Sequence, residues 1–318
     1  MTTAIIEAIR NNQSFLVAAH GKPDGDAMAS TLALRNALVK LGKDVVAYNQ
    51  DPVPQDLQFL PGAEAVVGAI APDASFDIGF ILDAGGLDRA GEHLAECCTR
   101  LINIDHHPFS EIDQALNYVD TSASATGVMV WRILAQMGFE FDRAVATCVY
   151  TAILADTGSF RYSNADREAF EVAGRMVDLG VDPWEISSRL YESQPEERLH
   201  LLGLALGTLE VSSCGRFASL VVTEDMYRIT GANAEHTDRF INYPRSIEGV
   251  EVAVFFRQVD RRRFKVGFRS AGRVDVGELA RRLGGGGHHN ASGALVDGTI
   301  EMVKRTVYRM LEEALSGD

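Results

Sequence analysis

The sequence predicts an α/β protein in which a doubly wound parallel-sheet domain precedes a smaller mixed α/β domain. Within about the first 110 residues, short apolar runs alternate with segments of helical periodicity, and the runs are continuously apolar. Continuous apolar strands are typical of a parallel sheet that helices cover on both faces. The pattern changes near Ser193, where one long helix precedes strands of a second, smaller sheet.

The elements of the amino-terminal part each follow from a local pattern. Apolar runs predict strands, and apolar residues with a period near 3.6 predict helices. A glycine directly follows three of the expected helices, at Gly42, Gly138 and Gly180, where glycine commonly ends a helix. Strands are expected at 14–19, 45–48, 76–82 and 101–104, and helices at 27–41, 124–137, 143–154 and 166–179.

The carboxyl-terminal part begins with a helix at 196–209 that could connect two domains. Two of its strands are separated by only a short polar turn, so a hairpin is expected there. Strands are expected at 217–222, 250–259 and 263–268, and helices at 276–283 and 300–315. The expected domains are 1–190, a helical linker at 191–207, and 208–318.

Composition limits the class of protein. The chain has 318 residues, of which 46% are hydrophobic, so two domains with sizeable cores are expected. No basic segment followed by an apolar stretch opens the chain, and no apolar run reaches the roughly 18–20 residues that span a membrane. We expect a cytoplasmic protein with no membrane partner. Four cysteines without a CxxC pair predict core fillers rather than structural zinc: Cys97, Cys98, Cys148 and Cys214.

The net charge of −14 argues against tight, sequence-independent binding to long duplexes. Basic residues nevertheless gather near the carboxyl end. Most of them are expected on the solvated faces of a hairpin and a helix, although a local basic patch also suits a short anionic substrate. They are Arg257, Arg261, Arg262, Arg263, Lys265, Arg269, Arg273, Arg281 and Arg282.

Acidic and histidine residues form four clusters where a strand or helix gives way to a loop. Five carboxylates and up to three imidazoles at one sheet edge would repel one another unless cations lay among them. Hard oxygen and imidazole ligands favour manganese or magnesium. One competing interpretation is that Asp26 is only a helix N-cap. The clusters are His20-x3-Asp24-x-Asp26, Asp83, Asp105-His106-His107 and Asp156.

A run of four glycines, Gly284–Gly287, precedes His288. Four glycines are often a flexible linker. Consecutive backbone N–H groups without Cβ hindrance also form a concave site for anions. The polar residues that follow the run favour the anion site.

In order, these motifs resemble those of the DHH phosphoesterases whose second domain carries the DHHA1 signature. His20-Gly-Lys-Pro-Asp24-Gly-Asp26 resembles motif I, Asp83 motif II, Asp105-His-His-Pro108 motif III and Asp156-Thr-Gly-Ser-Phe160 motif IV. Gly284-Gly-Gly-Gly-His288 resembles the GGGH element of the second domain. The resemblance covers nearly the whole chain, and members of similar length are of the nanoRNase/pAp-phosphatase type.

The resemblance implies a role for each motif residue. Asp83 and Asp156 would be shared between two Mn²⁺ ions, with Mg²⁺ as an alternative. His107 would lie beside the scissile phosphate, and Asp105 would orient a histidine. Arg269, Gly285, Gly286, Gly287 and His288 would grip a substrate phosphate, and the full metal ligand set would be His20, Asp24, Asp26, Asp83, His106 and Asp156.

The resemblance implies hydrolysis of short single-stranded RNA or DNA oligonucleotides, nanoRNA above all, and of 3′-phosphoadenosine 5′-phosphate (pAp). The substrate would lie in a cleft between the two domains. Phe160 and Tyr162 could stack on a base, although core packing or lining of the cleft wall is the simpler expectation. The helices at 124–137 and 196–209 could each carry a homodimer contact.

Four alternatives stay open. A cyclic-dinucleotide or linear-dinucleotide phosphodiesterase, acting on c-di-AMP or pApA, could use the same site. A RecJ-like single-strand exonuclease shares both domains but generally carries additional nucleic-acid-binding domains. A family II inorganic pyrophosphatase would lack the GGGH element. A nucleotide sensor with an inactive metal site would lack a carboxylate, whereas this ligand set is intact.

Overall fold

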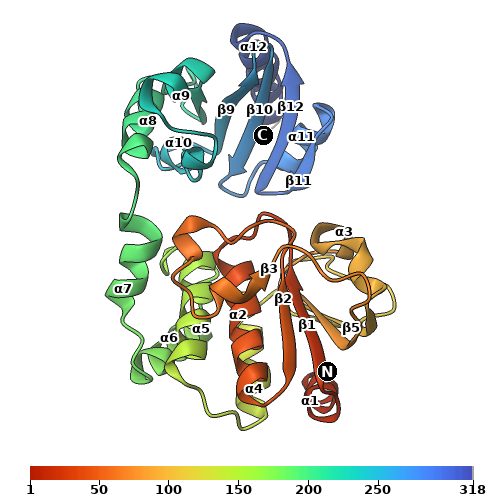
Figure 1. Cartoon of the computed structure of the whole chain (residues 1–318). Helices are drawn as coiled ribbons and strands as arrows, with labels where there is room; N and C mark the ends of the chain where they lie inside the picture. Colours follow the sequence, from red (N-terminus) through yellow and green to blue (C-terminus); the bar gives the residue numbers. More distant parts are fainter. Residues whose placement is uncertain (317–318) are drawn as a thin grey trace. The chain divides into compact units, whose positions relative to one another are not determined.

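The computed structural model describes residues 1–316, with every side chain among them except that of His288. The chain divides into two units, Met1–Ser193 and Gln194–Asp318, and each contains one six-stranded sheet (Figure 1). The expected fold class, a parallel α/β sheet followed by a mixed one, is confirmed. No helix within residues 1–316 combines the length and apolar character needed to cross a membrane.

The sheet of the first unit is entirely parallel and has the order β3-β2-β1-β4-β5-β6. Its strands are β1 (Ser14–Ala19), β2 (Asp44–Tyr48), β3 (Val66–Val67), β4 (Phe76–Leu82), β5 (Cys98–Asp105) and β6 (Leu116–Val119). The sequence did not predict β3 or β6. Both are short edge strands, and β6 is only half-buried, so neither has a strong apolar pattern.

Alternate side chains of β1 enter two separate cores. Phe15 and Val17 pack on one face of the sheet, and Leu16 and Ala18 pack on the other. Figure 1 shows α2, α4 and α5 together on one side of this sheet and α3 on the other. The helices are α1 (Thr2–Asn11), α2 (Gly25–Lys40), α3 (Leu87–Ala90), α4 (Thr126–Gln136), α5 (Arg143–Asp156), α6 (Arg167–Asp178) and α7 (Pro183–Ser187).

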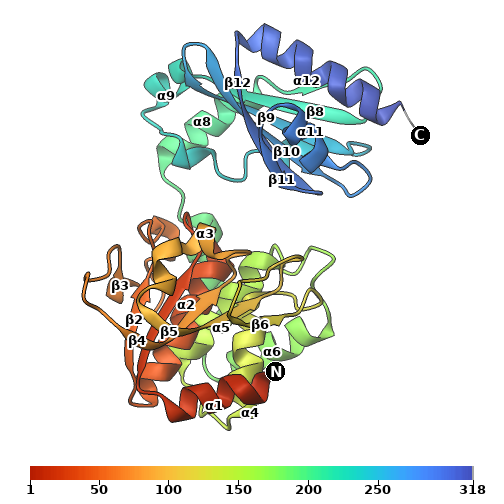
Figure 2. The same ribbon diagram turned by 90° about the vertical axis from the view of Figure 1, so that its right-hand side faces the viewer.

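The sheet of the second unit has the order β11-β12-β10-β9-β8-β7, with β8 and β9 parallel and the other pairs antiparallel. Its strands are β7 (Glu210–Val211), β8 (Phe217–Val222), β9 (Val252–Asp260), β10 (Arg263–Ser270), β11 (Gly286–His288) and β12 (Ala291–Asp297). Its helices are α8 (Glu196–Leu206), α9 (Glu224–Thr230), α10 (Asn242–Arg245), α11 (Val276–Arg282) and α12 (Ile300–Leu315). In Figure 2, α12 lies along one face of this sheet. Its buried side chains pack into the hydrophobic core of the second unit.

The helix expected as a linker, α8, packs within the second unit rather than standing apart from it. Leu201 and Ala205 are buried in a cluster with Val222 of β8 and Phe240. The helix therefore covers part of the sheet.

The cysteines are all free, as expected, but they are not all core fillers. Cys148 is buried, Cys97 and Cys98 are half-buried, and Cys214 is exposed. The prediction was therefore wrong for Cys214, which lies in a turn between β7 and β8 where no core is available.

Candidate metal centre

The metal-binding motifs meet where the strand order of the first sheet reverses direction. β1 and β4 are neighbours, and Ala19 pairs with Leu82, so His20 and Asp83 leave the sheet side by side. β5 is the next strand, and Leu82 pairs with its Ile104. The loops after these three strands therefore open at one carboxyl edge, at the point where α/β sheets collect ligands.

Close helix packing brings two further carboxylates to the same edge. A Cβ on Gly25 would lie 2.5 Å from the Cβ of Ala155, and a Cβ on Gly127 would lie 2.4 Å from the Cβ of Ala152. Because these glycines have no side chain, α2 and α4 both approach α5 closely. The approach places Asp26 of α2 near the last residue of α5, Asp156.

His106 lies at the centre of this group. Its Nε2 is 3.5 Å from Asp83 Oδ1, 3.8 Å from Asp26 Oδ2 and 3.8 Å from Asp156 Oδ2. Its Nδ1 lies 3.0 Å from the Ala123 carbonyl, which can only accept, so Nδ1 carries the proton. Nε2 is buried and has no hydrogen-bond partner among the described residues. A buried nitrogen lone pair that faces three carboxylates fits a cation.

A second set of ligands adjoins the first. His20 donates from Nδ1 to the Gly21 carbonyl, 2.9 Å away, and its Nε2 lies 4.0 Å from Asp83 Oδ2. Asp24 completes this set. One potential ligand atom from each member lies within 4.8 Å of the others in three groups: His20, Asp24 and Asp83; Asp26, His106 and Asp156; and Asp83, His106 and His107. The residues could hold a metal ion, and Asp83 belongs to two of the three groups.

The first turn of α2 differs from the competing interpretation that Asp26 is only a helix N-cap. Asp24, rather than Asp26, is the N-cap, since its Oδ1 accepts from Ala27 N at 3.0 Å. The Asp26 carboxylate instead accepts from the backbone N–H groups of Thr126 (2.7 Å) and Gly127 (3.0 Å). It is therefore fixed by the start of α4, and Ser30 Oγ of its own helix also donates to it at 2.7 Å.

Asp105 and His107 form a separate pair beside the ligand groups. His107 Nδ1 lies 2.9 Å from Asp105 Oδ1, and its backbone N–H donates to the same oxygen. The other carboxylate oxygen accepts from Gly85 N and from Ser110 Oγ. Burial alone would raise the pKa of Asp105, but hydrogen bonds from His107, Ser110 and Gly85 lower it below its usual range. Hydrogen bonds to Asp105 and Asp83 raise the pKa of His107 to about 11.

The pKa values of Asp83, Asp26 and Asp156 are shifted in the opposite direction. Burial, followed by the charge of Asp26, raises the pKa of Asp83 well above its usual range. Burial raises the pKa of Asp26 as well, and it raises that of Asp156 to about 7. Three acids that resist ionisation while close together favour either protons or a metal cation among them.

Two polar side chains that the sequence analysis missed fix these carboxylates. Thr126 Oγ1 donates to Asp83 Oδ1 at 3.0 Å, and Asn164 Nδ2 donates to Asp156 Oδ2 at 2.9 Å. Thr126 is the first residue of α4, and the polar segment before that helix was the available signal. Asn164 lies in a turn and had no distinguishing pattern.

The glycine run of the second unit forms part of its sheet rather than a loop. Gly286 pairs with Gly293, and Gly287 pairs with Ser292. A Cβ on Gly285 would lie 2.2 Å from the Gly293 carbonyl oxygen, so the backbones approach more closely than any other residue would allow. Only Gly286 and Gly287 of the run lie in β11, and the sequence did not predict this strand because a glycine pattern does not show strand pairing.

The strand register brings Arg269 close to this run. Ala291 of β12 pairs with Arg269 of β10 on one side and with His288 of β11 on the other, so the three backbones form one row. Arg269 is half-buried, and its Nη1 donates to the Phe268 carbonyl. The side chain of His288 lies outside the described part of the structure.

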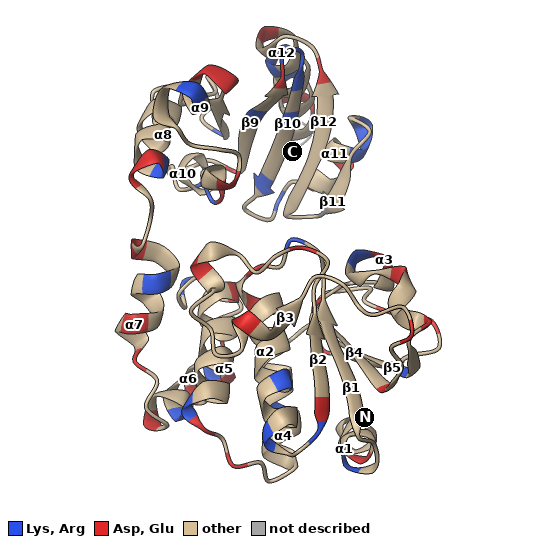
Figure 3. Ribbon diagram, in the orientation of Figure 1, with Lys and Arg blue, Asp and Glu red and all other residues tan. Residues whose placement is uncertain are grey.

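Most of the basic cluster is exposed to solvent, as expected, and several of its members pair with acidic residues. Arg263 pairs with Asp297, Arg281 with Glu278, and Arg282 with Glu313. Lys and Arg are interspersed with Asp and Glu in both units (Figure 3).

Comparison with known proteins agrees with this geometry. Residues 14–153 match the DHH family N-terminal domain, and residues 221–316 match the DHHA1 domain. The bifunctional oligoribonuclease and PAP phosphatase NrnA of Thermus thermophilus is 36% identical over 304 residues, which cover 94% of this chain and 90% of that protein. The chain belongs to the DHH family.

Two further members extend the similarity. The bifunctional oligoribonuclease and PAP phosphatase NrnA of Bacillus subtilis is 27% identical over 93% of this chain and 93% of its own length. An exopolyphosphatase-related protein from Bacteroides fragilis has a TM-score of 0.90 and 27% identity over 99% of this chain and 95% of its own. The resemblance to DHH phosphoesterases with a DHHA1 domain is confirmed.

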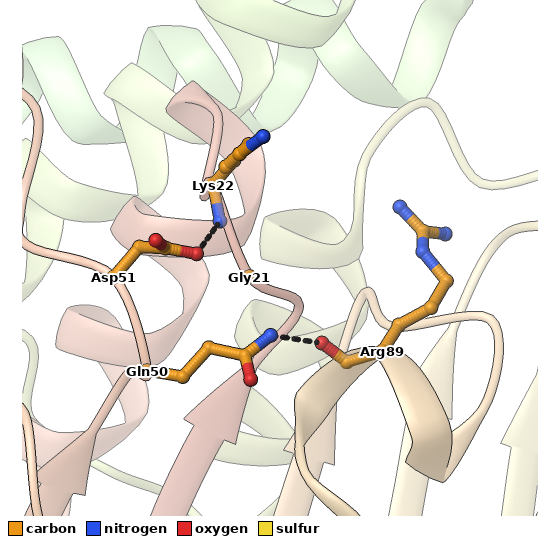
Figure 4. Close-up of a pocket in the computed structure, with 5 residues that line it drawn as sticks. All are labelled: Gly21, Lys22, Gln50, Asp51 and Arg89. Carbon is orange, nitrogen blue, oxygen red and sulfur yellow. Dashed lines mark hydrogen bonds between the residues drawn. The ribbon is translucent and has the colours of Figure 1, made fainter.

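The DHH domain also contains a pocket beside the motif I loop. Gly21, Lys22, Gln50, Asp51 and Arg89 line it (Figure 4). The Arg89 carbonyl accepts from Gly21 N and from Gln50 Nε2, which fixes the α3 segment to motif I. The Lys22 and Arg89 side chains are both exposed, and Asp51 also lines this pocket.

Proposed function

We propose that this chain is a metal-dependent phosphoesterase that hydrolyses short oligoribonucleotides and pAp. The observation that carries the proposal is the group of buried carboxylates around the lone pair of His106 Nε2. The relatives named for oligoribonuclease and PAP phosphatase activity match almost the whole chain, which supports these substrates over other phosphoesters.

The ligand set supports a centre of two divalent cations, manganese or magnesium. His20, Asp24 and Asp83 would hold one cation, and Asp26, His106 and Asp156 would hold the other. Bound there, the cations would acidify a water molecule and offset negative charge on the phosphoryl oxygens. Asp83 is the shared ligand in this scheme because it lies close to both His20 and His106.

His107 and Asp105 would act on the phosphate rather than on the cations. Asp105 accepts from His107 Nδ1, which fixes the imidazole ring. The hydrogen bond to Asp105 favours the protonated form of the His107 imidazole by raising its pKa. The imidazole can therefore donate a charge-assisted hydrogen bond to a phosphoryl oxygen.

The DHHA1 domain would bind a substrate phosphate. Arg269 offers a guanidinium, whose fork of donors matches a terminal phosphate. The run Gly285–Gly287, with the backbone of His288, offers N–H groups that no Cβ shields. The strand register that aligns Arg269 with His288 supports this assignment.

A panel of substrates tests the proposal. Turnover of pAp, pApA, a 5-mer, a 24-mer, c-di-AMP and pyrophosphate is measured with manganese, magnesium, and EDTA. We expect pAp and the short oligonucleotides to be hydrolysed only with a divalent cation. Preferred hydrolysis of c-di-AMP or pApA would identify a dinucleotide phosphodiesterase, and preferred hydrolysis of the 24-mer would identify a RecJ-like exonuclease.

A variant separates binding from chemistry. Arg269→Ala should raise KM for pAp, because a lost charge-assisted contact costs about 1.5–3 kcal/mol. Elemental analysis should find the wild-type metal content, since Arg269 lies in the second unit. Metal loss in Arg269→Ala would show that this residue had been assigned wrongly.

A further inference from the structure

Phe109 is exposed to an unusual degree and has an unfavourable backbone conformation. Its side chain is 98% exposed, and its φ is +63°. A bulky residue rarely adopts a positive φ, which favours glycine or asparagine. An exposed phenyl ring also forgoes the gain from burial. Neither feature helps the chain to fold.

The turn that holds Phe109 is fixed at both ends by the same buried carboxylate. His107 N donates to Asp105 Oδ1 at 2.8 Å, and Ser110 Oγ donates to Asp105 Oδ2 at 2.7 Å. Ser110 is itself buried, and Asn103 Nδ2 donates to its carbonyl. The ring is therefore kept in solvent by an anchored turn rather than by a loose loop.

Phe109 is also close to the reaction. It follows His107 by two residues, so their Cα atoms are at most about 7 Å apart. Strained conformations persist where the surroundings enforce them, and they concentrate at ligand-binding sites. A strained, exposed aromatic residue beside a phosphate-binding histidine therefore favours the binding of a ligand with a flat apolar surface.

Among the described residues, the two aromatic side chains that follow Asp156 are less exposed than Phe109, since Tyr162 is 38% exposed and Phe160 is half-buried. Phe160 stacks on Phe170, with centroids 4.9 Å apart, and packs against the core, as expected. Tyr162 lies against Gly158, where a Cβ would be 2.4 Å from its ring.

We infer that Phe109 is the stacking surface for the nucleobase of the nucleotide whose phosphate is at the metal centre. This inference rests on the proposed function and adds to it the part of the substrate that the DHH domain recognises. Stacking accepts every base, because each has a π face. A single exposed ring would therefore give affinity for nucleotides without sequence preference, which suits the removal of short oligonucleotides of any sequence.

Binding of AMP and of ribose 5-phosphate, which lacks the base, tests this inference without any turnover. Dissociation constants are measured by calorimetry with manganese for the wild type, Phe109→Asn and Phe109→Tyr. Asparagine tolerates a positive φ but has no ring, and tyrosine keeps the ring. We expect Phe109→Asn to weaken AMP binding roughly 5- to 100-fold, the range for one stacked base. Ribose 5-phosphate should bind all three proteins equally, and Phe109→Tyr should keep the preference for AMP.

Thermal unfolding provides a second measurement. Phe109→Asn should unfold at the wild-type temperature or above, because it relieves strain and loses no buried contact. An unchanged preference for AMP in Phe109→Asn, or equal weakening of both ligands, would overturn the inference. Failure of the wild type to hydrolyse pAp would instead count against the proposed function, since the binding measurement does not depend on turnover.

Discussion

Asp83 is unfavourable for folding in two ways. Its carboxylate is buried, and its φ of +54° lies in the left-handed region. No Lys or Arg side chain pairs with this carboxylate within the described structure, although Thr126 and three histidines approach it. The position is consistent with a carboxylate that is kept for a ligand, since strain of this kind concentrates at functional sites.

Asp83→Asn should reduce turnover of pAp at least 100-fold and lower the bound metal, because a neutral amide is a poor replacement for a shared anionic ligand. Asparagine adopts a positive φ readily, so the fold should be retained. Activity is measured with manganese, metal by elemental analysis, and folding by circular dichroism.

Asp88→Asn is the matched control for this substitution. Asp88 is an exposed residue in α3, after the same loop, and the same chemical change there should leave turnover and metal content at wild-type values. Full activity in Asp83→Asn, or in wild type treated with EDTA, would contradict a metal centre at this site.

Asp105→Asn should lower kcat about 10- to 100-fold, the usual effect of losing a residue that orients a ligand-binding histidine. Without the Asp105 carboxylate, the pKa of His107 should fall from about 11, because the imidazolium loses its main partner. The measurements are a histidine titration by NMR and the separate determination of kcat and KM. Metal content should stay unchanged.

Ser110→Ala is the control for the buried hydrogen bonds of Asp105. It removes one donor to Oδ2 and leaves the contact between Asp105 and His107. A fall in kcat as large as that of Asp105→Asn would show that Asp105 acts only through the structure of the turn.

The residue types of the metal centre could be predicted from the sequence, and their hydrogen bonds could not. Carboxylates and histidines at strand ends have few uses besides metal binding, so His20, Asp83 and His106 were recognisable. The sequence could not show which of Asp24 and Asp26 caps α2, because the carboxylate of Asp26 accepts from the backbone of Thr126, 100 residues away. Asn164 was missed because its contact with Asp156 depends on how a turn folds back.

At the scale of elements, most long periodic segments were predicted closely, whereas the helix α1 and several short elements were missed. α12 has the expected bounds, because its buried residues repeat every three or four positions over 16 residues. β6 and β11 are short, and β11 is built from glycine and histidine, which have no strand preference. Their pairing comes from the neighbouring strand rather than from their own sequence.

The pairing of β11 with β12 gives a test that uses two adjacent glycines. A Cβ on Gly287 would lie 2.5 Å from Ser292 Cα, and its φ is +139°, whereas a Cβ on Gly286 would meet nothing within 4 Å. Gly287→Ala should therefore destabilise the protein by about 1–3 kcal/mol, as overpacked sites do, and raise KM for pAp.

Gly286→Ala is the control, and it should change the free energy of unfolding little. Both variants are measured by urea unfolding and by steady-state kinetics. Equal effects of the two substitutions would show that the free energy of unfolding and KM depend on flexibility of the glycine run rather than on the close approach of β11 to β12.

At the scale of the whole molecule, the net charge of the protein favours short nucleic-acid substrates over long ones. The net charge is −14, and Arg263, Arg273, Arg281 and Arg282 near the carboxyl end are paired with acids. Long nucleic acids are bound through many Lys and Arg contacts to phosphates, and each contact makes the affinity more sensitive to salt. The described surface offers few such contacts beyond the site residues.

Activity per strand end should therefore fall from dinucleotides to pentanucleotides and further to a 24-mer. A long strand must run over a surface whose net charge repels it, while only a few of its phosphates are bound. Increasing salt from 50 to 200 mM should change KM for a 3-mer only modestly, whereas an enzyme that binds 6–10 phosphates loses about 10³–10⁵ in affinity over that range. The measurement is initial rate against substrate length at both salt concentrations. A 24-mer that is degraded processively and faster than the 3-mer, with a steep salt dependence, would show that the basic residues between Arg257 and Arg282 form a binding track for long strands.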